Sequence, residues 1–76
     1  MKDLISFIAK SLVDNPTSVS VSEDVDGDTH VYTLKVGEGE TGRVIGKHGR
    51  TARAMRILLN AAAMKNKIKA NLEIQD

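Results

Sequence analysis

Two glycines separated by two residues stand between segments of helical pattern, in the stretch Gly46-Lys47-His48-Gly49. Glycine has no Cβ, so such a turn lets the backbone of a ligand approach the protein main chain closely. The helix that follows begins with unpaired amides, and its dipole favours negative charge there. We therefore expect phosphate groups beside the amides of Gly49 and Arg50, with Lys47 and Arg50 as cationic donors.

Charge is divided along the chain, although the net charge is only +1. From Met1 to Glu40 there are three Lys/Arg and eight Asp/Glu, a net of −5. From Thr41 to Leu72 there are eight Lys/Arg and no acid, a net of +8, and the last four residues add −2. Acids beside a phosphate would repel it, so 32 acid-free residues favour a polyanion-binding surface over a merely solvated helix face.

Other kinds of chemistry find little support in the sequence. The lack of cysteine excludes disulfides and thiolate metal sites, and it fits a reducing cytoplasm, where we expect the protein. No apolar run approaches the roughly 20 residues that span a bilayer, and no secretion signal is recognisable. The acidic segment 24–28 lacks the spacing of a calcium loop, and no nucleophile–base–acid set can be built. We expect no enzyme activity, metal, cofactor or membrane partner.

Hydrophobic periodicity predicts one domain over 1–76 with the order α-β-β-α-α-β. Asn15-Pro16 should end the first helix, and Thr41 should cap the second. The acidic segment 23–29 should form a solvated hairpin with a turn signal at Asp26-Gly27, and His30 should occupy an edge-like strand position. The expected elements are a helix over 3–14, strands over 18–22 and 30–36, helices over 41–45 and 50–64, and a strand over 68–74.

The stretch Ile45-Gly46-Lys47-His48-Gly49 matches the I-G-x-x-G signature of KH domains, whose GXXG loop clamps about four nucleotides. A stand-alone chain of this length with Gly42-Arg43-Val44-Ile45-Gly46-Lys47 closely resembles the bacterial KhpA (YlqC-like) family over its whole length. The resemblance implies a type II KH fold of the α+β class, a three-stranded sheet with helices packed on one face. Ala52 departs from the pattern, because KH signatures often carry a large aliphatic residue there.

The resemblance implies a role for each residue around the GXXG loop. The glycines allow close approach, the residues between them contact phosphate, and the flanking arginines add charge. One of Val44 and Ile45 should pack in the core while the other faces the bases, and the sequence leaves open which does so. The implied RNA-binding residues are Arg43, Val44, Ile45, Gly46, Lys47, His48, Gly49, Arg50 and Arg53.

The helix over 50–64 carries apolar residues around most of its circumference. Met55, Leu58, Leu59 and Ala62 should face the core, with the arginines of this helix, including Arg56, on the opposite side. A second apolar stripe should serve self-association or a partner, and Leu58 at the edge of the core face can belong to it. The residues of the predicted partner interface are Ala54, Ile57, Leu58, Ala61 and Met64.

The resemblance also implies a function: binding of single-stranded RNA in post-transcriptional control or RNA chaperoning, linked to cell shape and envelope growth. Contacts to few nucleotides are weak, and joining two domains raises apparent affinity. We therefore expect a homodimer or a heterodimer, and the partner that the family implies is the larger KhpB (Jag/EloR-like) protein. The alternative is a protein-interaction module in which RNA binding is secondary.

Overall fold

The computed structural model describes residues 1–75 and confirms the predicted α+β fold with the type II KH order. Asp76, the last residue of the predicted domain, lies outside the described residues. Two short 3₁₀ turns, η1 (Pro16–Ser18) and η2 (Lys47–Gly49), join the main elements. The main elements are α1 (Lys2–Leu12), β1 (Ser20–Asp26), β2 (Thr29–Lys35), α2 (Thr41–Ile45), α3 (Arg50–Lys65) and β3 (Lys69–Gln75).

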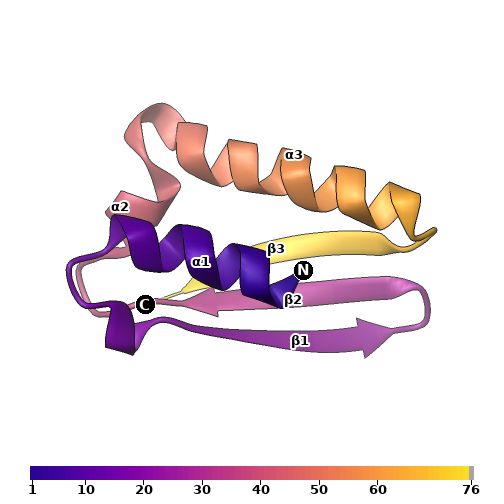
Figure 1. Ribbon diagram of the computed structural model, residues 1–76, viewed down its shortest axis with the longest axis horizontal. Coiled ribbons are helices and arrows are strands. Elements are labelled where there is room, and N and C mark those ends of the chain that lie inside the picture. Colours follow the sequence, from indigo (N-terminus) through magenta and orange to yellow (C-terminus); the bar gives the residue numbers. More distant parts are fainter. Residues whose placement is uncertain (76) are drawn as a thin grey trace.

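The three strands form one sheet in the order β1-β2-β3. The central strand β2 pairs antiparallel with β1 across the hairpin and parallel with β3. A parallel pair needs a long crossover, which here contains α2 and α3. Figure 1 shows α1 in front of the strands and α3 running along β3, so the crossover carries the GXXG turn to one end of the molecule.

The core lies between the helices and one face of the sheet. It joins every main element except β1, whose Val21 packs against it only partly buried. Val44 of α2 is fully buried, which fixes this short helix, and with it the start of the GXXG turn, against the rest of the domain. Within residues 1–75, no helix has the length and apolar character needed to cross a bilayer. The core cluster consists of Ile5, Ala9, Val13, Tyr32, Leu34, Val36, Val44, Met55, Leu59 and Leu72.

Two predicted boundaries of helices and strands in the N-terminal half of the chain were wrong. The helix α1 ends at Leu12, before Asn15-Pro16, and Pro16 instead begins η1. The solvated acidic hairpin is confirmed, but its strands extend further than predicted, because β1 runs to Asp26 and β2 begins at Thr29. Only Gly27 and Asp28 form the turn, where Gly27 has a φ of +65°. Acidic side chains suit β1 because it is an edge strand with most of its residues exposed to water.

The start of α2 is tied to the end of α1, and Thr41 does not cap the helix as predicted. Glu40 precedes the helix, and no side-chain cap bond forms. The Glu40 carboxylate instead accepts hydrogen bonds from the N–H groups of Asp14 (2.7 Å) and Asn15 (3.3 Å). Arg43 of α2 pairs with Asp14 at 3.1 Å. These contacts join the residues after α1 to α2, so they hold in place the segment that leads into the GXXG turn.

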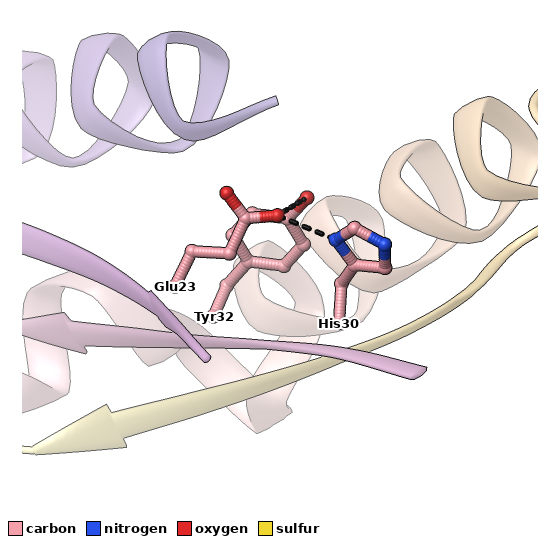
Figure 2. A network of polar contacts seen from close by, with 3 residues as sticks. All are labelled: Glu23, His30 and Tyr32. Carbon is pink, nitrogen blue, oxygen red and sulfur yellow. Dashed lines mark hydrogen bonds and ion pairs between the residues drawn. The ribbon is translucent and has the colours of Figure 1, made fainter. Parts of the chain in front are cut away.

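A polar cluster joins β1 and β2, with three side chains pointing to the same side of the hairpin (Figure 2). His30 lies on the central strand, so its predicted edge-like position was wrong. Its Nδ1 lies 2.6 Å from Oε2 of Glu23, and the Tyr32 hydroxyl donates to the same oxygen at 3.0 Å. The hydrogen bond with His30, followed by that from Tyr32, lowers the pKa of Glu23. Burial, then the bond to Glu23, raises the pKa of Tyr32.

This cluster predicts a pH-dependent contribution to stability. The pKa of Glu23 lies below its ordinary value of 4.5 in the folded protein. The contribution is therefore fully present above that value and is lost as the pH falls through the lower, folded pKa. We expect the free energy of unfolding of wild type to exceed that of Glu23→Gln at pH 7, and the difference to shrink below pH 4.5. Urea unfolding at a series of pH values measures it. Glu38→Gln, the same change at an exposed site, serves as the control, and a Glu23→Gln difference that persists unchanged at pH 3 would contradict the assignment.

Candidate nucleic-acid interface

The GXXG turn has a backbone that most residues cannot adopt. Gly46 has φ 79° and ψ 170°, a region essentially restricted to glycine. His48 (φ 58°, ψ 24°) and Gly49 (φ 72°, ψ 15°) both have left-handed conformations. The left-handed conformation costs a residue with a Cβ about 1–2 kcal/mol. The chain therefore reverses sharply between α2 and α3 and leaves Lys47 and His48 exposed at its tip.

The amides expected to bind phosphate are not free. The N–H of Gly49 donates to the carbonyl of Gly46 at 3.0 Å, and the N–H of Arg50 donates to the carbonyl of Lys47. The sequence pattern did not reveal the 3₁₀ turn that uses them, so this part of the prediction was wrong. The N–H groups of Lys47 and His48 have no protein partner within residues 1–75. These two amides, with the side chains beside them, are the donors available at the turn.

The two glycines meet different surroundings. A Cβ built on Gly46 would lie 2.8 Å from the Cβ and 3.0 Å from the main-chain nitrogen of Thr51, closer than real atoms approach. A Cβ on Gly49 would meet nothing within 4 Å. Gly46 is thus needed for the packing of the turn against α3, whereas Gly49 leaves open space beside the main chain.

That open space continues into a groove of about 500 Å³ between the turn, α3 and the end of β3. Aliphatic side chains line part of it, and two arginines of α3 line the rest. Such a mixture of apolar surface and cations suits bases and phosphates together. The lining residues are Ile45, Gly49, Ala52, Arg53, Arg56 and Ile74.

The structure decides between Val44 and Ile45. Val44 is fully buried in the core, whereas Ile45 is 36% exposed and lines the groove. Ala52, the departure from the common KH signature, is buried and also borders the groove. Because alanine is small, it leaves room in the groove that a larger aliphatic side chain would fill.

The predicted cations separate into two groups. Arg53 lines the groove, and Lys47 and His48 are exposed at the turn. Arg43 pairs with Asp14 and, like the exposed Arg50, is not among the residues that line the groove. Within residues 1–75, no three His, Asp or Glu residues are grouped as a metal site requires.

Arg56 lines the groove although sequence reasoning placed it opposite the core. The buried residues of α3 are Ala52, Met55, Leu59 and Ala63. The face of the helix that packs in the core therefore lies closer to Arg56 than predicted. The prediction that Leu58 faces the core was wrong, because Leu58 is 49% exposed, and Ala62 is only partly buried. The predicted core face was chosen from the large apolar side chains of the helix. In the structure, the alanines Ala52 and Ala63 form half of the buried face, because small side chains let the helix pack closely on the sheet.

The second apolar stripe of α3 lies on its outer side. All five predicted residues are exposed, with Ile57 at 62% and Met64 at 77%. A run of exposed aliphatic side chains along one helix is unusual for a monomer surface and is typical of a contact with another protein. The stripe consists of Ala54, Ile57, Leu58, Ala61 and Met64.

A family model described as "KhpA/KhpB, KH domain" matches residues 2–74. The chain belongs to this family. The chain is 47% identical over its full length to all of an RNA-binding protein KhpA from Halalkalibacterium halodurans. It is 41% identical to RNA-binding protein KhpA of Chlamydia trachomatis, covering 97% of that protein. The Clostridium perfringens KhpA is 46% identical, with 97% of this chain and 99% of that protein covered.

Two solved structures of Era contain a similar fold. Era from Aquifex aeolicus, bound to GDP and aluminium fluoride, matches with a TM-score of 0.62 at 17% identity. A second Era structure, in complex with a nucleotide analogue and part of 16S ribosomal RNA, matches with a TM-score of 0.53 at 18% identity. Each match covers 97% of this chain but less than a third of the Era chain, 29% and 28% respectively. At this identity the likeness establishes the fold alone.

The different surroundings of the two glycines predict different costs of substitution. Gly46→Ala combines a forbidden backbone region with a clash against Thr51, and we expect it to lower the free energy of unfolding by about 3 kcal/mol. Gly49→Ala meets open space and should cost about 1 kcal/mol. Urea denaturation followed by circular dichroism compares them. Gly39→Ala is the control, with a φ of +82° and nothing near its Cβ. Equal losses at positions 46 and 49 would refute the packing role of Gly46.

Proposed function

We propose that this chain binds single-stranded RNA, with the sugar-phosphate backbone across the GXXG turn and bases in the adjoining groove. The observation that supports this most directly is the exposed turn opening onto the groove of Ile45, Arg53 and Arg56. Lys47 and His48 supply unpaired amides for phosphate, Lys47 adds a cationic side chain, and Ile45 supplies apolar surface for a base. Curated relatives that match the whole chain are named RNA-binding proteins.

The kind of RNA follows from the shape of the groove. One wall carries arginines, and the groove has no aromatic residue on which bases stack. A double helix is recognised mainly by its shape and backbone, whereas unpaired bases can be splayed into such a groove. The few phosphate contacts make the affinity modest and dependent on salt.

Reversing charge at the turn tests this function. We expect Lys47→Asp combined with His48→Asp to weaken the binding of single-stranded RNA by about tenfold or more, because carboxylates replace the donors to phosphate. Fluorescence anisotropy with a labelled RNA of random sequence measures the affinity, and circular dichroism checks the fold. The control is the double variant Lys10→Asp and Lys35→Asp. It changes the net charge by at least as much as the turn variant does, but on α1 and β2. Unchanged affinity in the turn variant would disprove the proposed function.

We further infer that the apolar stripe of α3 is a self-association surface. It lies on the outer side of the helix, so it stays available while the groove is occupied. Burying aliphatic side chains such as Ile57 and Met64 against a second copy stabilises a domain whose own core is small. A dimer would also hold two RNA-binding turns on one strand and raise the apparent affinity.

Charging the stripe should separate the subunits. We expect wild type to have about twice the 8.2 kDa mass of one chain and Ile57→Lys to be monomeric, because a buried lysine is costly without a partner. Light scattering after size exclusion measures the mass. Val25→Lys is the control, since Val25 has a similar exposure of 59% on β1. A wild type that remains monomeric at millimolar concentration would exclude the homodimer.

The family resemblance gives this function a biological setting. It supports a role in post-transcriptional control or RNA chaperoning linked to cell shape and envelope growth, within the cytoplasm. It also supports a heterodimer with a larger KhpB (Jag/EloR-like) protein through the same stripe. The alternative function, a protein-interaction module with secondary RNA binding, is favoured by the exposure of Ile57, Leu58 and Met64. A turn variant that loses RNA affinity but keeps the dimer would separate the two activities.

A further inference from the structure

The helix α1 carries exposed apolar side chains that the proposed RNA binding does not use. Phe7, the only phenylalanine of the chain, is 72% exposed. Leu4, three residues before it on the same helix, is 42% exposed. Neither residue lines the groove beside the GXXG turn. An exposed aromatic ring beside an exposed leucine indicates a contact with another molecule.

Phe7 points away from the sheet. It lies two residues from Ile5 and two residues from Ala9, and both of these are buried in the core. Two residues correspond to about 200° around an α-helix. Phe7 therefore lies on the side of α1 opposite the face that packs on the sheet.

The apolar stripe of α3 has the same relation to its own buried face. Ile57 lies two residues from Met55 and two residues from Leu59, which are both buried. By the same spacing, Ile57 lies opposite the face of α3 that packs in the core.

The two helices cover the same face of the sheet. Tyr32, Leu34 and Leu72 belong to the core cluster that also holds the buried residues of α1 and α3. Tyr32 and Leu34 alternate along β2, and Tyr32 pairs with Leu72 of β3, so all three side chains lie on one face of the sheet. The outer sides of α1 and α3 therefore lie on one side of the molecule, and we call them together the two-helix face.

The stripe of α3 is small for a stable dimer interface. A standard interface has about 800 Å² and roughly 20–30 residues on each partner. The stripe holds five residues, and Ala54 and Ala61 are two of them. The outer side of α1, with Phe7 and Leu4, extends the apolar surface from one helix to two.

The charges of the two helices favour a contact between α1 of one copy and α3 of the other. The helix α3 carries four cations and no acid, whereas α1 carries two lysines and Asp3. Two copies that met through α3 alone would therefore bring together two strongly positive helices, which repel each other. A contact with α1 brings a helix of lower net charge against the stripe.

We propose that Phe7 of one copy packs on the α3 stripe of a second copy, so that the dimer forms through the two-helix face. This inference rests on the proposed self-association and names the contact that completes it. In a two-fold symmetric dimer each copy presents the same surface, so the contact of Phe7 with the stripe occurs twice.

The dissociation constant of the dimer tests the role of Phe7. Light scattering after size exclusion at a series of protein concentrations measures it, and circular dichroism checks the fold. We expect Phe7→Lys to raise the constant at least tenfold, because a lysine would be buried without a partner. Val25→Lys makes the same kind of change at an exposed site on β1 and should keep the wild-type value.

Two outcomes separate this inference from the self-association on which it rests. If Phe7→Lys dimerises like wild type while Ile57→Lys is monomeric, the stripe of α3 is an interface and the role of Phe7 is overturned. If wild type is itself monomeric, the proposed self-association fails and this inference fails with it.

Mixing two variants tests which helices meet. Phe7→Lys and Ile57→Glu each alter both contacts of a dimer that pairs α1 with α3. An equimolar mixture restores one wild-type contact and places lysine and glutamate together in the other, whereas a dimer that pairs like helices gains no wild-type contact. We expect the mixture to dimerise at least tenfold more tightly than either variant alone. A mixture that dimerises no more tightly would overturn the pairing of Phe7 with the partner's stripe.

Discussion

The packing of Gly46 against Thr51 constrains the whole interface. No Cβ fits between them, and the conformation of Gly46 is essentially restricted to glycine. This contact holds the start of α3 against the turn that follows α2, so that Ile45 and Arg53 line the same groove. A wider turn would move the apolar side chain of Ile45 away from the cationic side chain of Arg53.

Apart from the ion pair between Arg43 and Asp14, most acidic and basic side chains of the domain lie on different elements. The acids of β1 and the hairpin lie at one edge of the sheet, and the cations of α3 lie near the other edge, beyond β3. Two strand spacings of about 4.8 Å put these edges roughly 10 Å apart, close to the screening length at 0.1 M salt. The acidic half can therefore serve as scaffold with little repulsion of a phosphate strand. Glu40 is used within this scaffold, because it accepts main-chain hydrogen bonds from the end of α1.

The helix α3 presents three different faces. Ala52, Met55, Leu59 and Ala63 pack on the sheet. The polar face beginning at Arg53 borders the groove, and the outer apolar stripe remains exposed. Because the groove and the outer stripe lie on different sides of α3, the proposed RNA binding and the proposed self-association would not compete for the same surface.

The sequence alone determined the class of fold, the order of the elements and the position of the GXXG turn, because these depend on local periodicity and on glycine spacing. It also revealed the exposed stripe of α3, since Ile57 and Met64 recur at helical spacing outside the expected core.

Only the tertiary structure decided which residues meet across elements. Val44 and Ile45 look alike in sequence, but the rotation of α2 buries one and exposes the other. Arg56 and Ile74 come together because the parallel pairing of β3 brings its end beside α3. The hydrogen bonds that occupy the amides of Gly49 and Arg50 depend on the 3₁₀ turn, which carries no distinct residue pattern. The burial of Val44 and the meeting of Arg56 with Ile74 depend on packing between segments that are distant in the sequence, and a local residue pattern does not encode such packing.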